Sequence, residues 1–144
     1  MKSMRTILMR KGHQIYTIDP EATVLEALQK MADKNVGALL VVKDGQVKGI
    51  ISERDCARKL DIKGRCAKDT PVKDIMTTHV LFLDISNTAE EAMAIMINKR
   101  IRHLPVYEDK KLVGIISIGD VVKAIIEDQK FTIEQLENYI MGTY

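Results

Sequence analysis

The sequence has little of what extracellular, membrane-bound and nucleic-acid-binding proteins depend on. Its two cysteines, Cys56 and Cys66, cannot form a disulfide framework and do not fit a zinc-binding spacing, so a reducing, cytoplasmic setting is expected. Tryptophan is absent and aromatic residues make up 4% of the chain, which leaves few rings for stacking on unpaired bases. No apolar run approaches the roughly 18 residues of a membrane span. Basic residues also interrupt the first segment, where a signal peptide needs an apolar stretch.

Charge of one sign is not in excess either. The 144 residues include 22 Lys and Arg and 20 Asp and Glu, and this formal net charge of +2 argues against a general polyanion binder. Nucleic-acid binding would require a local patch. The segment that joins the two halves of the chain offers one, although we favour a solvated surface; its charges are Lys59, Lys63, Arg65, Lys68 and Lys73. Hydrophobic residues at 46% are close to the globular average, so the chain should fold as one domain or two small halves.

Signatures of catalysis are also missing. The three histidines, His13, His79 and His103, fall at no metal-ligand spacing. The chain contains no serine in a nucleophile elbow and no glycine-rich phosphate loop of the P-loop type. We therefore expect no enzymatic activity, no metal and no catalytic cofactor.

What the sequence does contain is an internal repeat at an offset of 65 residues, without a gap. Residues 18–60 overlie residues 83–125. The run Gly-Ile-Ile-Ser at 49–52 recurs at 114–117, and Asp55 recurs as Asp120. Other identical pairs are Asp19/Asp84, Thr23/Thr88, Glu26/Glu91, Ala27/Ala92, Met31/Met96, Leu39/Leu104, Val41/Val106 and Asp44/Asp109. The chain is a tandem duplication.

The first half of each copy predicts a strand followed by a helix. A short apolar segment, 15–18 or 80–83, precedes Thr-x-x-Glu at 23–26 or 88–91, which is a capping box at a helix start. Apolar residues then recur at i, i+3, i+4 and i+7, so each helix should be amphipathic. The expected buried stripes are Val24, Leu25, Leu28, Met31 and Ala32 in the first copy and Ala89, Ala92, Met93, Met96 and Ile97 in the second.

The second half of each copy predicts a hairpin followed by a helix. Apolar runs at 38–42 and 47–51 flank Lys43-Asp44-Gly45-Gln46, where glycine suits a tight turn. The runs at 104–107 and 112–116 flank a turn without glycine, which leaves its type open. Helices over 53–60 and 118–129 complete a β-α-β-β-α unit twice.

Three segments lie outside the repeats. Met4–Lys11 predicts a short helix stopped by Gly12. In the connector Asp61–Asp74, Thr70 as N-cap and Pro71 as first residue should begin a short helix that reaches Met76. Thr132–Met141 predicts a separate final helix, with a capping box formed by Thr132 and Gln135. We accordingly expect two domains, 1–74 and 75–144, one repeat in each.

A duplicated β-α-β-β-α unit whose last strand ends in Gly-h-h-Ser-x-x-Asp, where h is an apolar residue, strongly resembles the tandem cystathionine-β-synthase (CBS) domain module. The stretches 52–55, 74–77 and 100–106 are similar to the stand-alone bacterial members. The resemblance implies an α/β (α+β) fold with the two CBS repeats packed about a pseudo-two-fold axis, and disc-like homodimers. It also implies two clefts that hold an adenosine ligand such as AMP, ATP, NAD(H) or S-adenosylmethionine.

The main candidate ligand-binding residues are Ser52 and Asp55 in the first repeat and Ser117 and Asp120 in the second. Each pair sits where a strand meets a helix, so plain capping is one interpretation. In the other interpretation the helix amides receive phosphate and the Asp carboxylate accepts hydrogen bonds from ribose hydroxyls. The two roles are compatible.

Arg102 and His103 enter a strand, where charged residues are usually solvated. By resemblance that position borders the cleft of Asp55, where a guanidinium suits phosphate. Arg54, next to Asp55, either pairs with that neighbour or reaches the same phosphates.

The remaining candidates are small or apolar. Gly37 and Ala38 occupy the matching positions of the first repeat, where they either pack closely against a helix or, as the resemblance implies, let the backbone approach an adenine. Ile15 and Val80 either flank the ligand rings or belong to the core. Thr77 and Val36 complete the set of candidate ligand-binding residues.

The leading hypothesis is a regulatory sensor module that binds an adenine nucleotide, without catalysis, as a homodimer. The alternative is a ligand-independent dimerisation or interaction module in which 132–144 docks on an unidentified regulated protein. Membrane partners are not expected, and nucleic acid is the least supported of the binding partners.

Overall fold

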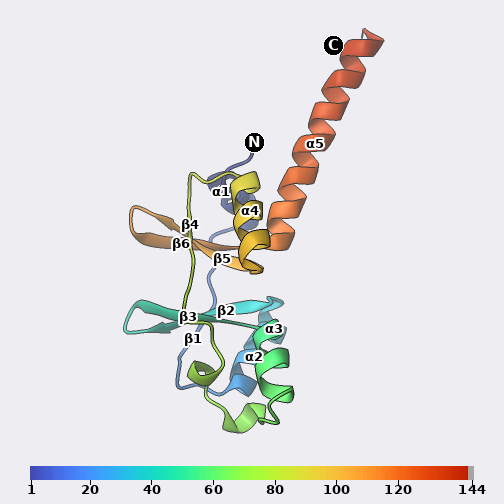
Figure 1. The fold of residues 1–144 in the computed structure, drawn as a ribbon. Helices are drawn as coiled ribbons and strands as arrows, with labels where there is room; N and C mark the ends of the chain where they lie inside the picture. Colours follow the sequence, from blue (N-terminus) through green and yellow to red (C-terminus); the bar gives the residue numbers. More distant parts are fainter. Residues whose placement is uncertain (143–144) are drawn as a thin grey trace. The chain divides into compact units, whose positions relative to one another are not determined.

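The computed structural model describes residues 1–142 and divides the chain into two compact units (Figure 1). The central unit is Ile15–Val80. The split unit combines residues 1–14 with the chain from Leu81 onward. This division differs from the expected 1–74 and 75–144, because the N-terminal segment packs with the second repeat and the connector packs with the first.

Each unit contains a three-stranded sheet of the same topology. In the central unit the sheet has the order β1-β2-β3, and in the split unit β4-β5-β6. The first pair of strands is parallel and the second antiparallel in both. The elements of the central unit are β1 (Thr17–Ile18), α2 (Val24–Lys34), β2 (Ala38–Lys43), β3 (Gln46–Ser52) and α3 (Glu53–Cys56). Those of the split unit are α1 (Met4–Lys11), β4 (Leu83–Asp84), α4 (Ala89–Lys99), β5 (His103–Glu108), β6 (Lys111–Ser117) and α5 (Ile118–Met141).

The duplication is exact in most of the secondary structure. Helices α2 and α4, strands β2 and β5, and strands β3 and β6 are each related by the 65-residue offset, and both hairpins carry an irregularity at the matching position. The predicted α/β fold of two tandem repeats is confirmed. The first strand of each repeat is shorter than predicted, because only two residues pair with the following strand.

The helices that follow the first strands bury a narrower stripe than predicted. Val24, Ala27 and Met31 are buried in α2, as are their repeat partners in α4. Leu25, Ala32 and Ile97 were expected in the core and are exposed instead. Positions i, i+3 and i+7 are buried, and the i+4 residues Leu28 and Met93 pack partly against the core. Both predicted N-caps form: the Thr88 and Glu91 pair is fully reciprocal, and Thr23 accepts a hydrogen bond from the Glu26 amide.

The two hairpins share one turn conformation although only one has a glycine. Asp44 and Gly45 have φ values of 51° and 74°, and Asp109 and Lys110 have 49° and 66°. Two consecutive positive φ angles match the turn that suits the twist of paired strands. Lys110 therefore holds a left-handed conformation that glycine adopts at lower cost.

The connector does not start a helix at Pro71 as predicted. It forms two 3-10 turns, η2 (Ala67–Asp69) and η3 (Val72–Asp74), and Pro71 precedes the second in an extended conformation. The buried Thr70 hydroxyl donates to the Cys66 carbonyl at 2.7 Å instead of capping a helix. The helix predicted over 53–60 is regular only through α3 and continues as a π-helical turn, η1 (Ala57–Asp61).

The last two predicted helices are a single one. Helix α5 runs for 24 residues, through the point where Thr132 was expected to begin a new helix. The Thr132 hydroxyl donates to the Asp128 carbonyl, four residues earlier, at 3.1 Å. A threonine can satisfy its hydroxyl in this way inside a helix, so a capping-box pattern does not by itself end one.

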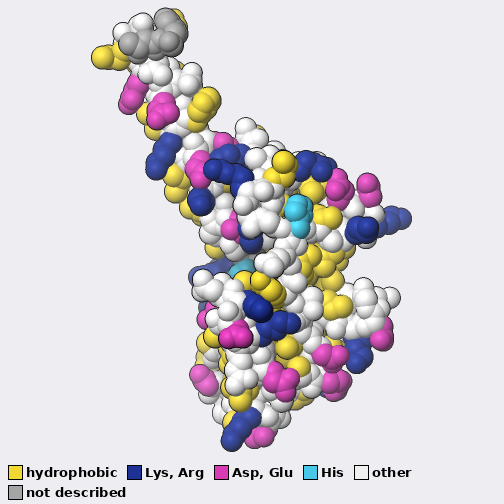
Figure 2. Space-filling model, turned by 180° about the vertical axis from the view of Figure 1, so that it is seen from behind, with side chains coloured by type: hydrophobic (Ala, Val, Ile, Leu, Met, Phe, Trp, Pro, Cys, Tyr) yellow, Lys and Arg dark blue, Asp and Glu magenta, His cyan; other side chains and the backbone are white. Residues whose placement is uncertain are grey.

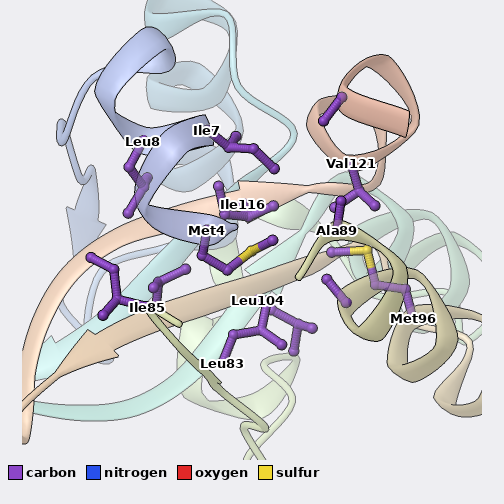
Figure 3. Close-up of a cluster of buried hydrophobic side chains, with 13 residues drawn as sticks. Met4, Ile7, Leu8, Leu83, Ile85, Ala89, Met96, Leu104, Ile116 and Val121 are labelled. Carbon is purple, nitrogen blue, oxygen red and sulfur yellow. The ribbon is translucent and has the colours of Figure 1, made fainter. Parts of the chain in front are cut away.

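Helix α1 belongs to the core of the split unit (Figure 3). Met4 and Leu8 are fully buried among residues of the sheet and of α4, including Leu104 and Ile116. The Met4 amide also donates to the Asn87 carbonyl at 2.8 Å. The prediction of a helix over Met4–Lys11 that ends at Gly12 is confirmed. Its packing against the second repeat was not predicted.

Candidate functional site

The Ser-x-x-Asp motif forms the same reciprocal cap in both units. In the central unit the Ser52 hydroxyl accepts from the Asp55 amide at 3.1 Å, and Asp55 Oδ2 accepts from the Ser52 amide at 3.0 Å. In the split unit Ser117 accepts from the Asp120 amide at 3.2 Å, and Asp120 Oδ2 accepts from the Ser117 amide at 2.8 Å. The predicted capping is confirmed. Each carboxylate is held in one orientation at the start of its helix.

Both oxygens of Asp55 have partners within the central unit. Oδ1 lies 3.4 Å from the Thr77 hydroxyl, which donates to it, and 3.4 Å from the Lys59 ammonium. Thr77, which follows the connector, is held there because its backbone exchanges hydrogen bonds of 3.0 and 2.9 Å with Ile50 in β3. Lys59 also donates to the Ile75 carbonyl at 3.0 Å. Both contacts to Oδ1 are longer than a usual hydrogen bond, so they are weak.

Asp120 carries a shorter ion pair. The Lys11 ammonium, from the end of α1, lies 2.6 Å from Asp120 Oδ2 and donates to the Ile115 carbonyl at 2.8 Å. Burial alone raises the pKa of Asp120, but the Lys11 ammonium and the Ser117 amide outweigh it, so the net pKa is lowered. Asp120 is therefore ionised at neutral pH, and the contacts described here all fall on Oδ2.

The lysines beside the two carboxylates were not singled out from the sequence as site residues. Lys59 was assigned to the solvated connector, although its i+4 spacing from Asp55 on a helix was a usable signal. Lys11 lies in a segment outside the repeats and 109 residues from Asp120, and no local pattern relates the two.

The glycine of the Gly-Ile-Ile-Ser motif provides space for the segment that reaches each carboxylate. A Cβ at Gly49 would lie 2.7 Å from the Thr77 carbonyl oxygen and 2.8 Å from the Met76 sulfur. A Cβ at Gly114 would lie 2.5 Å from Leu8 of α1. The same glycine thus admits Met76 and Thr77 in one unit and α1 in the other.

The residues that open the second strand of each repeat lie beside the serine of the same repeat. Ala38 pairs with Ser52 and His103 pairs with Ser117. The Gly37 carbonyl accepts from the Glu53 amide at 3.0 Å. In the split unit, the Arg102 carbonyl likewise accepts from the first amide of α5 at 2.8 Å. Arg102 and His103 belong to the split unit and Asp55 to the central unit. Their expected role beside Asp55 stays a prediction.

A pocket in the central unit adjoins the start of β2. It has a volume of ≈ 300 Å³ and includes two of the candidate residues, Val36 and Gly37. Its other lining residues are Leu28, Met31, Ala32, Asn35 and Glu53. This volume is at the lower end of the range for small-molecule sites, enough for a group the size of a base.

The other candidates are dispersed within their units. Arg54, Ile15 and Val80 are half-buried in the central unit, and Thr77 is the one that reaches a candidate carboxylate. Among residues 1–142 no group of three His, Cys, Asp or Glu side chains is placed to hold a metal ion. No helix in the same range combines the length and apolar character needed to cross a membrane.

Part of the basic connector is neutralised. Arg65 pairs with Asp74 at 2.9 Å, and Lys73 pairs with Glu21 at 2.9 Å. Together with the contact of Lys59 to Asp55, these pairs reduce the positive charge that a nucleic acid would meet.

Comparison with known families agrees with this geometry. The family model described as "CBS domain" matches residues 4–62 and 72–127. Each of the two matches contains one β-α-β-β-α unit and one Ser-x-x-Asp helix cap, at matching positions. The chain belongs to the CBS domain family and carries a tandem pair of the domains.

Several relatives are similar over most of this chain. The CBS domain-containing protein CBSX3, mitochondrial, of Arabidopsis thaliana is 42% identical over 127 residues, which is 85% of this chain and 62% of that protein. The chain thus spans less than two thirds of that relative. A solved CBS domain structure, NE2398, is 47% identical with a TM-score of 0.82, covering 87% of this chain and 98% of the other.

A more distant structure shares the fold. The CBS domain pair of MJ0100, solved in complex with 5′-methylthioadenosine and S-adenosyl-L-methionine, is 22% identical with a TM-score of 0.77. The match covers 89% of this chain and 98% of the other.

Proposed function

We propose that the chain is a non-catalytic regulatory module that binds an adenosine nucleotide, of the AMP, ATP or NAD(H) type, at the two Ser-x-x-Asp junctions. The observation that carries the proposal is that each junction presents a fixed carboxylate beside an ammonium. Asp55 has Lys59 beside it and Asp120 has Lys11. A carboxylate is a strong acceptor for a ribose diol, and an ammonium is a natural partner for phosphate. The adenosine ligands of the distant relative MJ0100 are of the same chemical class.

The two junctions should differ in preference. The second repeat has Arg102 and His103 where the first has Gly37 and Ala38, so at these matching positions only the second repeat supplies positive charge. In our proposal Arg102 and His103 serve the ligand on Asp55, as the resemblance implies, and that site prefers the more phosphorylated ligand. The ligand on Asp120 is then a plainer adenosine or a monophosphate. Arg102→Ala should weaken ATP binding more than adenosine binding.

Thermal unfolding with AMP, ADP, ATP, NAD⁺, NADH, S-adenosylmethionine and coenzyme A tests the proposal. A ligand at a hundred times its Kd stabilises the fold by about 2.7 kcal/mol, which is a rise in Tm of roughly 8 °C for a chain of this size. Asp55→Asn and Asp120→Asn should each reduce the rise, because the substitution keeps the cap geometry and removes the charge.

The matched controls are Asp44→Asn and Asp109→Asn. These aspartates are also related by the repeat but lie at the hairpin tips, and their left-handed backbone suits asparagine. Unchanged Tm with all seven compounds at millimolar concentration would reject the proposal and favour the alternative, a ligand-independent interaction module.

The proposal includes a homodimer. Apolar side chains remain exposed on the helices of both units, among them Leu25 in α2, Ile97 in α4 and Val122 in α5. In our proposal these side chains are covered by a second copy of the chain, as contiguous apolar patches at protein–protein interfaces are. Light scattering should give the mass of a dimer at micromolar concentration. A cytoplasmic location remains our expectation, while the plant relative carries the word mitochondrial in its name.

A further inference from the structure

The second half of α5 has no cover within its own unit. Val121 and Ala124, in the first turns, are buried, whereas every residue from 129 to 142 is exposed. Figure 1 shows this part of the helix extending past α1 and α4 of the same unit. A helical extension of about 14 residues is marginal in water without tertiary packing. Its exposed large hydrophobic residues are Phe131, Ile133, Leu136, Tyr139, Ile140 and Met141.

Part of this apolar surface forms a heptad stripe. Ile126, Ile133 and Ile140 recur every seven residues, and Val122, Gln129 and Leu136 recur at the alternate positions between them. This is the a and d pattern of a two-stranded coiled coil, with isoleucine at a and one polar residue, Gln129, within the stripe. Figure 2 shows hydrophobic side chains recurring along the projecting helix.

The stripe is distinct from the side of α5 that packs on its own unit. One residue turns an α-helix by about 100°, which places the centre of the stripe about 100° from Val121 and about 160° from Ala124 around the helix axis. Val122 and Ile126 lie on the stripe at the anchored end of the helix and are 38% and 45% exposed. The stripe is therefore continuous from the body of the unit to the end of the described helix.

The charges beside the stripe indicate what covers it. Lys130 and Glu137 are seven residues apart, so they occupy the same edge, and they have opposite charges. When two copies of this helix pair antiparallel with Ile133 opposite Leu136, Lys130 of each copy lies beside Glu137 of the other. One two-fold axis thus forms two opposite-charge pairs at once. In a parallel pair the residues facing Lys130 and Glu137 are Ile125 and Thr132, which offer no charge.

We propose that residues 129–141 of α5 pair antiparallel with the same segment of a second copy as a short coiled coil. The contact lies away from Asp120, the candidate carboxylate of the same unit, and it does not depend on the nucleotide proposal. Its central layers are Ile133 against Leu136, twice, and its edges are the two Lys130–Glu137 pairs.

Charge exchange in the full chain tests the proposal. The variants Lys130→Glu and Glu137→Lys each place like charges opposite each other in their own antiparallel pair, but a mixture of the two variants restores both attractive pairs. Tagged Lys130→Glu should retain untagged Glu137→Lys roughly tenfold better than it retains untagged Lys130→Glu. Contacts elsewhere on the molecule contribute equally to both mixtures. Equal retention would overturn the proposal.

Disulfide crosslinking checks the direction of the helices. In a Cys66→Ser background, Ile133→Cys chains should crosslink with Leu136→Cys chains more than either variant does with itself. Adding Phe131→Asp, on the opposite face of the helix, should leave this crosslink intact, and adding Ile140→Asp should abolish it. Crosslinking of Ile133→Cys only with itself would indicate a parallel pair, and no crosslink in any mixture would indicate that another molecule covers the stripe; either result overturns the proposal.

Discussion

The ion pair between Lys11 and Asp120 offers a direct test of how the split unit is held together. Lys11→Met keeps the length and apolar stem of the side chain while removing its charge and its donors to Asp120 and Ile115. The two side chains are 34% and 25% exposed, so the pair lies between a surface ion pair and a buried one. Exposed pairs contribute up to about 1 kcal/mol and breaking buried ones costs about 3–5 kcal/mol. After allowing for solvent screening, we expect a loss of about 1–2 kcal/mol at pH 7.

The pH dependence of this loss follows from the sign of the pKa shift. The pKa of Asp120 is lowered in the folded protein, so the pair stabilises the fold above the ordinary carboxyl pKa of 3.8. That contribution is lost as the pH falls through the lowered value. Without Lys11, burial opposes ionisation with only Ser117 against it, and the pKa of Asp120 should rise. The stability difference between wild type and Lys11→Met should therefore narrow as the pH falls from 6 toward and below 3.8.

Urea unfolding of wild type, Lys11→Met and Lys11→Arg across this pH range measures the effect, and a carboxyl NMR titration follows Asp120 itself. Lys11→Arg keeps the charge and should recover most of the stability. A loss in Lys11→Met that is as large in acid as at pH 7 would refute the reasoning, because it would show that packing of the side chain, and not its charge, is what matters.

Two further predictions concern single residues. Burial, with the nearby carboxylates of Asp55 and Glu53, raises the pKa of the Cys56 thiol to about 11, whereas the Cys66 thiol is exposed. A thiol reagent at pH 8 should therefore modify only Cys66 in the folded protein and both cysteines in urea. Rapid modification of both in the folded protein would contradict this. Gly49→Ala should lower the free energy of unfolding by about 1–3 kcal/mol, because the new Cβ meets the Thr77 carbonyl oxygen. Gly45→Ala in the same hairpin measures backbone strain alone, because its Cβ meets no atom within 4 Å and its φ is positive. A Gly49→Ala variant with the same urea midpoint as wild type would show that the close approach of Met76 and Thr77 has no cost.

The sequence determined the elements that depend on short-range patterns. The 65-residue repeat, the capping pairs and the alternation of apolar runs predicted both hairpins and the helices α1, α2 and α4 close to their observed bounds. These elements are predictable because they depend on residues a few positions apart. One copy also predicts the other because the same residues recur 65 positions later. The family followed from the same motifs, because the Ser-x-x-Asp cap of each junction is itself a local structure.

Tertiary structure alone decided the features that join distant segments. Helix α1 could be predicted as a helix, but only the burial of Met4 and Leu8 in the second repeat shows which unit it completes. The same packing brings Lys11 to Asp120, which is 109 residues away in the sequence. No periodic pattern in the sequence predicts this ion pair. Thr132 illustrates the converse, since a valid capping pattern lies unused inside α5, where the helix continues and its hydroxyl finds a carbonyl four residues back. A local sequence pattern indicates which helix, strand or turn a segment is able to form. Which of these forms depends on the apolar surfaces that the rest of the chain can bury.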